Sequence, residues 1–169
     1  MKNTRIFQIL IVSLFALVSL TSYAGSKQSS GAITQVEVDT FIKQINKAFE
    51  SKNIDKVMSF VNEDATIIAD IDPAPQKGSQ KFTKAQLSAM LKMTFPMIDS
   101  VTVRYRILDF NYNAEKAVAE TTVEYVTEAS AMGQKSIEKT MSKYHLARKG
   151  DSLTIKYQKD EILSSQMAN

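Results

Sequence analysis

The sequence predicts an α+β domain in which helices come first and long, hairpin-linked strands follow. Residues 34–50 and 83–94 have apolar side chains at intervals of three and four, which is the spacing of one face of a helix. Residues 100–162 instead alternate between apolar and polar side chains, with short turn sequences between the stretches, as antiparallel strands do. Helices followed by a run of strands indicate the α+β class.

The first helix is predicted to begin directly after Thr34. Thr34 and Glu37 have the spacing of a capping box, in which each side chain accepts a hydrogen bond from the backbone amide of the other residue. One apolar stripe then runs along the helix, formed by Val38, Phe41, Ile42, Ile45, Ala48 and Phe49. Asn53 is expected to cap a second, shorter helix over residues 54–61.

Sequence breaks mark the elements that follow. Residues 65–71 are rich in β-branched side chains and are expected to form a strand, whereas residues 72–82 contain prolines and a glycine and are expected to form a loop. Thr83 and Gln86 repeat the capping-box spacing and open a third helix, which Pro96 ends. Strands are then expected over residues 100–110, 117–128, 135–149 and 152–162, with a tight hairpin turn at Gly150 and Asp151.

The strand expected over residues 135–149 contains the only histidine of the chain, and its apolar residues change phase. They lie at odd positions in the first half and at even positions in the second: Ile137 and Met141, then Tyr144 and Leu146. Because side chains alternate along a strand, the change predicts a β-bulge near residues 142–143, with Tyr144 facing inward and His145 outward. Without a bulge, His145 faces inward.

The N-terminus has the layout of a secretory signal peptide. A basic start with Lys2 and Arg5 precedes an uncharged apolar run over residues 6–20, and the small residues Ser22 and Ala24 favour cleavage after Ala24. A membrane anchor is the alternative, but the apolar run is shorter than the roughly 20 residues that a membrane span requires. We therefore expect a periplasmic or secreted protein without a stable membrane anchor.

A single domain is expected after this leader. The predicted organisation is a signal peptide at 1–24, a flexible leader at 25–33, the domain at 34–163 and a C-terminal tail at 164–169. The chain contains no cysteine, so disulfides and cysteine-linked lipid anchors are excluded. It has 21 Lys and Arg against 18 Asp and Glu, and because two of the basic residues lie in the signal peptide, the mature chain is almost neutral. This balance argues against a nucleic-acid partner.

Two segments resemble the nuclear-transport-factor-2-like superfamily, also called SnoaL-like. Residues 41–67 read FIKQINKAFESKNIDKVMSFVNEDATI, and residues 144–157, YHLARKGDSLTIKY, match the closing hairpin of the family. The resemblance covers residues 34–163 and implies a cone-shaped, cystatin-like fold with N-terminal helices packed on a curved antiparallel sheet. The superfamily includes polyketide cyclases, ketosteroid isomerase, scytalone dehydratase and uncharacterised secreted proteins, so the fold by itself does not indicate one function.

The resemblance to ketosteroid isomerase suggests a set of acid–base residues. The base of that enzyme directly precedes a proline after the first strand, which corresponds to Asp72, with Asp70 as a near alternative. The tyrosine donor of the family falls near Ile45, which has no proton to donate, and the second donor falls near Tyr144 or His145. An isomerase, dehydratase or cyclase of this kind would use Asp70 or Asp72 with His145.

Binding of a small, largely apolar molecule without catalysis is the leading functional expectation. The hydroxyl groups expected to line the pocket belong to Tyr105, Tyr125, Tyr144 and Tyr157. A role of these tyrosines in the core, with hydroxyls bonded at the rim, fits the pattern equally well. A single histidine without cysteine makes no metal site, and neither a metal nor a cofactor is expected.

The outer face of the sheet is expected to be charged. Its basic residues Arg104 and Arg106 are expected to pair across neighbouring strands with the acidic residues Glu120 and Glu124. Such pairs contribute little when exposed, and a half-charged face suits solvent or a polar interface. A homodimer through this face is therefore expected, and a dimeric assembly module without a ligand is the third functional alternative.

Overall fold

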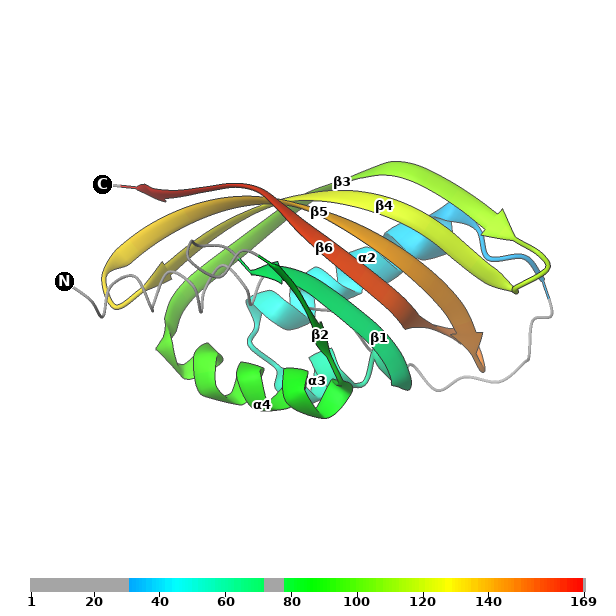
Figure 1. The fold of residues 1–169 in the computed structure, drawn as a ribbon, viewed down its shortest axis with the longest axis horizontal. Helices are drawn as coiled ribbons and strands as arrows, with labels where there is room; N and C mark the ends of the chain where they lie inside the picture. The colour runs from blue at the N-terminus through cyan, green and yellow to red at the C-terminus, as the bar shows by residue number, and fades with distance from the viewer. Residues whose placement is uncertain (1–30, 72–77, 169) are drawn as a thin grey trace.

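A curved sheet with helices on its concave side makes up residues 31–71 and 78–168, the part of the chain that the computed structural model describes (Figure 1). The helices are α2 (Gln35–Glu50), α3 (Ile54–Met58) and α4 (Lys84–Thr94), and a 3-10 helix spans Phe95–Met97. The strands are β1 (Val61–Ile71), β2 (Gly78–Phe82), β3 (Ile98–Asn113), β4 (Val118–Ala131), β5 (Gln134–Lys149) and β6 (Ser152–Ala168). The predicted α+β class is confirmed.

The strands form one six-stranded sheet in the order β2-β1-β6-β5-β4-β3. Strands β3 to β6 are joined by antiparallel hairpins, as predicted. β1 pairs with β6 in parallel, so the sheet is mixed rather than wholly antiparallel. The parallel pair arises because the chain crosses from β2 at one edge to β3 at the other and then returns, strand by strand, until β6 lies beside β1.

Part of the predicted loop at 72–82 is a strand instead. β2 pairs antiparallel with β1, from Gly78 opposite Ile71 to Phe82 opposite Ile67. Phe82 is buried in the core, which anchors this short strand. The polar residues before it have little β propensity of their own, so the edge of β1 decides the conformation. Residues 72–77 lie outside the described part of the chain.

Both predicted capping boxes are present. The Thr34 hydroxyl accepts from the Glu37 amide at 3.3 Å, while Glu37 Oε2 accepts from the Thr34 amide at 2.8 Å. Thr83 and Gln86 form the same pair of bonds at the start of α4. Asn53 caps α3 through the Lys56 amide, as expected. These local bonds satisfy the amides that a helix start leaves without partners, and they therefore determine where the helices begin.

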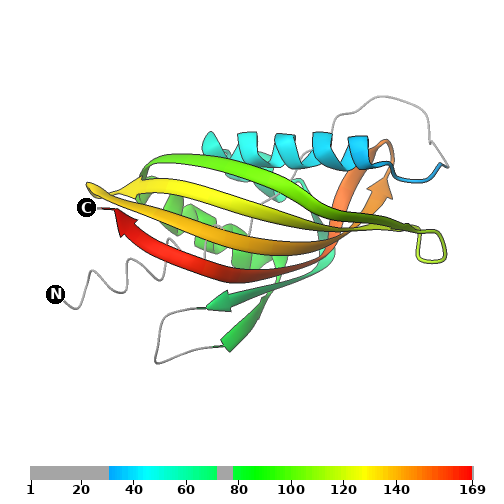
Figure 2. The same cartoon turned by 90° about the horizontal axis from the view of Figure 1, so that it is seen from above.

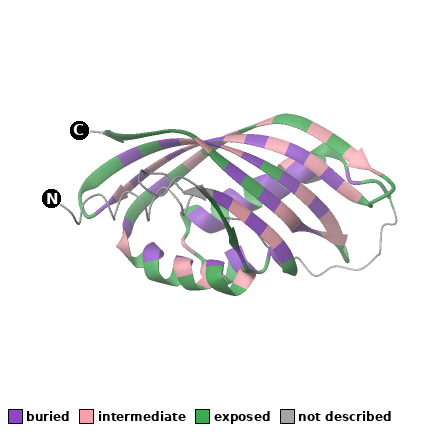
Figure 3. Ribbon diagram, in the orientation of Figure 1, coloured by how far each residue is buried: buried purple, intermediate pink, exposed green. Residues whose placement is uncertain are grey.

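The core lies between the concave face of the sheet and the helices (Figure 3). The predicted stripe of α2 is buried throughout, and it carries Phe41 and Phe49 into edge-to-face contacts. Phe41 contacts Phe60 with ring centroids 5.6 Å apart, and Phe49 contacts Phe95 with centroids 5.0 Å apart. Within the described residues, no helix is long and apolar enough to cross a membrane.

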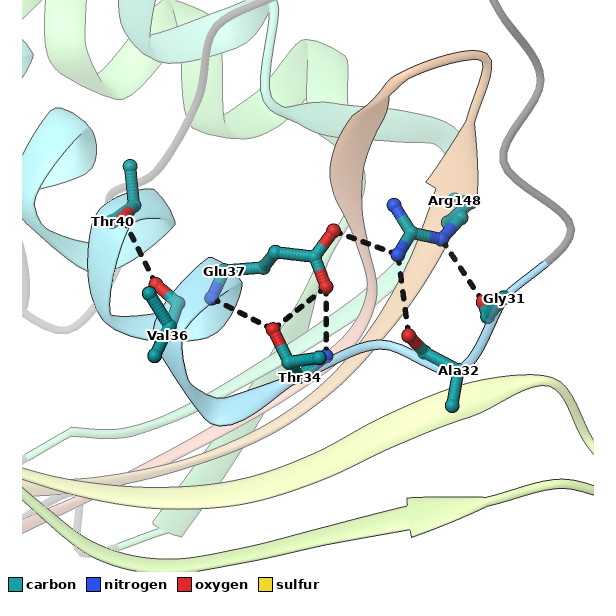
Figure 4. A network of polar contacts seen from close by, with 7 residues as sticks. All are labelled: Gly31, Ala32, Thr34, Val36, Glu37, Thr40 and Arg148. Carbon is teal, nitrogen blue, oxygen red and sulfur yellow. Dashed lines mark hydrogen bonds and ion pairs between the residues drawn. The ribbon is translucent and has the colours of Figure 1, made fainter.

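The chain enters α2 through a network around Arg148 of β5 (Figure 4). The guanidinium of Arg148 donates to Glu37 Oε1 at 2.7 Å and to the carbonyl oxygens of Gly31 and Ala32 at 3.3 and 3.4 Å. Ile33, the next residue, is buried in the core. This segment was expected to belong to the flexible leader and instead packs on the domain. The predicted signal peptide lies outside the described residues.

Arg148→Ala is expected to lower the free energy of unfolding by about 1 kcal/mol, because the half-buried Glu37 carboxylate and two backbone carbonyls lose their shared donor. Urea unfolding measures the loss. Arg104→Ala is the matched control, since its ion pair with Glu128 is exposed and should contribute less than about 0.5 kcal/mol. Equal losses in the two variants would show that the Arg148 network does not anchor the N-terminal segment.

The predicted β-bulge in β5 is absent, and the predicted phase of the first half of that strand is wrong. Even-numbered residues of β5 are buried along its length from Ser136 to Leu146, so the phase never switches. Ile137 and Met141 therefore lie on the outer face. The register shifts of this hairpin place the extra residues in β6, at Lys156 and Leu163. β6 continues to Ala168, so residues 164–168, expected in a tail, pair with β5.

Candidate functional site

Polar side chains occupy inward positions of β5 and β6 where a continuous apolar face would be the usual arrangement. Glu138 and Asp160 are buried, with 2 % and 0 % of their surface exposed. The register places Asp160 opposite Ser142, and Gln158 opposite Tyr144. We call the following residues the inner polar cluster: Tyr125, Glu138, Thr140, Tyr144, Gln158 and Asp160.

Hydrogen bonds link the cluster in pairs. Thr140 Oγ1 donates to Glu138 Oε1 at 2.8 Å, and Gln158 Nε2 donates to Asp160 Oδ2 at 2.7 Å. The Tyr144 hydroxyl donates to the Tyr125 hydroxyl at 3.1 Å. The second carboxyl oxygen of Glu138, Oε2, is buried and has no hydrogen-bond partner among the described residues. A buried polar atom without a partner is costly, so this oxygen is the position at which a ligand could complete the network.

The cluster is arranged to hold neutral proton donors. Burial is the main cause that raises the pKa of Glu138 to about 8; the hydrogen bond from Thr140 opposes the rise, and the charge of Asp160 adds to it. Burial, and then the neighbouring Tyr144 and Asp160, raise the pKa of Tyr125 well above its ordinary value. At neutral pH, Glu138 is therefore a carboxylic acid that can donate a hydrogen bond in a low-dielectric environment.

His145 lies on the outer face, as the favoured expectation held, although not through a bulge in its own strand. Its position is opposite Glu120 of β4 and Tyr157 of β6. The imidazole stacks on the Tyr157 ring, with centroids 4.8 Å apart and planes inclined by 33°. The residues on either side of it, Tyr144 and Leu146, are buried. His145 and Tyr157 therefore face away from the inner polar cluster.

Asp70, one of the two aspartates expected to act with His145, is not brought to it by the backbone. Asp70 lies in β1 opposite Ser79, and its side chain is outside the described structure, as is the whole of Asp72. Across the sheet, His145 lies opposite Tyr157 of β6, which lies opposite Thr66 of β1, so the three residues form one row. Asp70 is two strands away and about 13 Å further along β1 from that row, given the rise of an extended chain.

Replacing His145 by alanine is expected to change the free energy of unfolding by less than about 1 kcal/mol, since only a ring contact on the outer face is lost. Tyr144→Phe keeps the ring and removes the buried donor to Tyr125, which should cost about 1–2 kcal/mol. Urea unfolding of both variants tests the assignment of faces. A greater loss for His145→Ala than for Tyr144→Phe would contradict it.

The four tyrosines expected to line a pocket are distributed over different sites. Tyr125 and Tyr144 belong to the inner polar cluster, and Tyr157 is on the outer face. The Tyr105 hydroxyl donates to Asp39 Oδ1 at 2.7 Å, and burial together with this carboxylate raises the pKa of Tyr105. Tyr105 lines an open groove of about 570 Å³ between α2 and β3.

Sequence reasoning missed Glu138, Gln158 and Asp160. In the sequence, Glu138 stands beside Ile137, and the apolar residue of the pair was assigned to the inner face. Asp160 stands in the run QKDE, which is typical of an exposed strand. Alternation followed back from Leu146 and Tyr144 toward the start of the strand, without a bulge, was the one signal that would have assigned Glu138 to the inner face.

The outer face carries the expected ladder of charges with altered pairing. Arg106 contacts Glu124 at 3.2 Å, as predicted, and Lys139 contacts the same carboxylate at 2.6 Å. Arg104 pairs with Glu128 rather than with Glu120 or Glu124. The difference follows from the register, because Arg104 lies opposite Val126 and its side chain reaches the next outward acid along β4.

Comparisons with known proteins agree on the fold. No family model matches the sequence, and no curated protein matches it. Among solved structures, the chain is similar to a hexachlorocyclohexane dehydrochlorinase from Novosphingobium barchaimii, with a TM-score of 0.62, 6 % identity, and coverage of 79 % of this chain and 89 % of that one. It is also similar to a ketosteroid isomerase-like protein from Erwinia carotovora, with a TM-score of 0.58, 13 % identity, and coverage of 76 % and 95 %.

A third structure to which the chain is similar is described by the name of its fold. It is a nuclear-transport-factor-2-like protein of unknown function from Silicibacter pomeroyi, with a TM-score of 0.54, 9 % identity, and coverage of 75 % of this chain and 93 % of that one. The fold is nuclear-transport-factor-2-like. The resemblance seen in the sequence is thus confirmed at the level of the fold. At these identities the nuclear-transport-factor-2-like fold positions a site without assigning a reaction to it.

Proposed function

We propose that this domain binds a small, largely apolar molecule on the inner face of the sheet, and that a polar atom of the ligand accepts a hydrogen bond from Glu138. The observation that carries the proposal is the buried Glu138 carboxyl, which is held protonated and has one oxygen without a partner among the described residues. A neutral donor in a buried site favours a carbonyl or hydroxyl oxygen over a cation. Tyr125 and Tyr144 of the cluster also belong to the buried apolar core, which is the environment that the rest of such a ligand requires.

The probe for the test is 2-acetylnaphthalene, an apolar ketone that accepts hydrogen bonds and donates none. The fluorescence of the ketone reports binding without interference from tryptophan, because the chain contains none. Glu138→Leu is expected to weaken binding about tenfold, since the donor is lost, while Glu138→Gln keeps an N–H donor and most of the affinity. Naphthalene is the matched ligand without a carbonyl, and Glu138→Leu should leave its binding unchanged.

Two results would contradict the proposal. One is binding of 2-acetylnaphthalene that Glu138→Leu leaves unchanged, and the other is an equal loss of affinity for naphthalene. In the native chain, binding of the ketone should also weaken as the pH rises through about 8, where Glu138 loses its proton. The Glu138→Gln variant should not show that weakening.

A proton-transfer enzyme of the same fold is the second candidate, and a specific observation favours it. Glu138 and Asp160 are buried on one face, and the charge of Asp160 helps to keep Glu138 protonated. Two buried carboxyl groups, one of which is held protonated, can act as an acid and a base. The test is deuterium incorporation into the methyl group of 2-acetylnaphthalene in D₂O. Incorporation that depends on the protein and is lost in Asp160→Asn would support catalysis; none would favour binding alone.

We also propose that the chain is exported and that it dimerises through the outer face. The support for export is the basic start and apolar run of the first 24 residues, and protein recovered from a periplasmic extract should begin at Gly25. The support for a dimer is the half-charged outer face, and sedimentation at increasing salt measures it. A stable dimer whose inner face binds neither probe would favour the assembly module.

A further inference from the structure

β3 is an edge strand, and the end of α2 covers only the first part of that edge. Figure 2 shows α2 running alongside β3. Glu50 Oε1 accepts from the Val103 amide at 2.8 Å, and Lys52 Nζ donates to the Ile98 carbonyl at 2.7 Å. These side chains form hydrogen bonds with backbone groups that could otherwise pair with another strand. Covering an edge in this way is common in proteins.

The hydrogen bond at Val103 shows which backbone groups point away from the sheet. The Val103 amide bonds to a side chain outside the sheet, so it faces away from β4. Because these groups alternate along a strand, the amides and carbonyls of Tyr105 and Ile107 face the same way. Among the described residues, neither amide donates to a side chain or to a backbone group outside the sheet. The register shifts at Leu108, so the uncovered edge runs from Tyr105 to Ile107.

This uncovered edge adjoins the open groove of about 570 Å³ between α2 and β3. The residues that line the groove are Gln35, Val36, Asp39, Tyr105, Arg106 and Ile107. Val36 is 75 % exposed, although it is apolar and lies in the first turn of α2. The hydrogen bond from Tyr105 to Asp39 holds the helix beside the strand. The groove therefore offers an apolar side chain next to backbone groups that can pair with an extended chain.

Charges on the outer face indicate what could pair there. Across β5, β4 and β3 the signs alternate, from Lys139 to Glu124 to Arg106. A strand added beyond β3 continues this alternation if its outward residues are acidic. A second copy that paired through the same edge would place its own Arg104 and Arg106 against those of the first, and like charges directly opposite destabilise a pair. At this edge, the charges thus disfavour pairing with a second copy and favour an acidic partner.

We propose that the edge of β3 from Tyr105 to Ile107 binds an extended, acidic segment of a partner protein, which adds to the sheet as a further strand. Its acidic side chains lie beside Arg104 and Arg106, and its alternate apolar side chains cover Val36 and the groove. The backbone of the partner bonds to the amides and carbonyls of Tyr105 and Ile107. This mode of recognition combines main-chain bonds for affinity with alternate side chains for specificity.

Fluorescein-labelled peptides test the proposal by fluorescence anisotropy with the purified chain. A peptide that alternates glutamate and valine should bind, and one that alternates lysine and valine should bind about tenfold more weakly or not at all. Two further peptides carry N-methyl groups on alternate amides of the acidic peptide, in one phase or in the other. Only one phase faces β3, so one N-methylated peptide should lose about tenfold in affinity while the other should bind like its parent.

Variants of the chain complete the test. Ile107→Pro removes an edge amide that does not pair with β4 and should weaken the acidic peptide about tenfold, whereas Ile107→Val keeps the amide and should not. If Ile107→Pro does not fold, as circular dichroism will show, the N-methylated peptides make the same distinction with the native chain. Equal binding of the acidic and basic peptides, equal binding of both N-methylated forms, or self-association that Ile107→Pro abolishes would each overturn the proposal.

Discussion

Replacing Glu138 by glutamine is expected to remove a large pH dependence from the stability of the fold. The folded pKa of Glu138, about 8, is above its ordinary value of 4.5. Below pH 4.5 both the folded and the unfolded chain carry the proton. As the pH rises from 4.5 to 8, the unfolded chain releases it and the folded chain keeps it, so the free energy of unfolding falls. Across this window the loss from Glu138 is about 3–5 kcal/mol.

Glutamine has the shape of the protonated acid and does not titrate, so Glu138→Gln should match the native chain near pH 4.5 and be more stable than it at pH 8. Urea unfolding at several pH values measures the difference. Glu115→Gln is the control, because Glu115 is exposed in the turn before β4 and its replacement should leave the pH profile unchanged. Parallel profiles for the native chain and Glu138→Gln would show that Glu138 is ionised in the folded protein.

Phe49→Ala is expected to cost about 3–5 kcal/mol of the free energy of unfolding. Phe49 is 2 % exposed at the C-terminal end of α2, and its ring packs edge-to-face against Phe95, directly after α4. The substitution removes apolar contact area and leaves a cavity between elements that hold each other in place. A loss of this size is a large share of the stability of a domain of this length.

Val36→Ala is the matched control on the same helix, since Val36 is exposed and should change the free energy of unfolding by less than about 0.5 kcal/mol. Urea unfolding with an unchanged slope would show that the loss belongs to the folded state. A cost below about 1 kcal/mol for Phe49→Ala would contradict the packing described for α2.

The sequence by itself determined the features that depend on neighbouring residues. Thr34 and Glu37 satisfy the first amides of α2, and Thr83 and Gln86 do the same for α4, whatever the rest of the chain does. The stripe of α2 and the alternation in β4 assigned their buried faces correctly, because each has one unbroken period. The hairpins follow from short turns, in which Gly133 and Gly150 adopt the positive φ that glycine allows without strain.

Only the tertiary structure decided which face of the first half of β5 is buried and which strand pairs with β1. The pairing of β5 with β4 and β6 holds Glu138 inside, and the bulges that adjust the register lie in β6, far along the chain. The polar side chains tolerate burial because Thr140 bonds to Glu138 and Gln158 to Asp160, and because Glu138 gives up its charge. Each of these bonds joins residues two apart in one strand. The burial that raises the pKa of Glu138 instead comes from the packing of other elements around β5, which no local pattern in one strand contains.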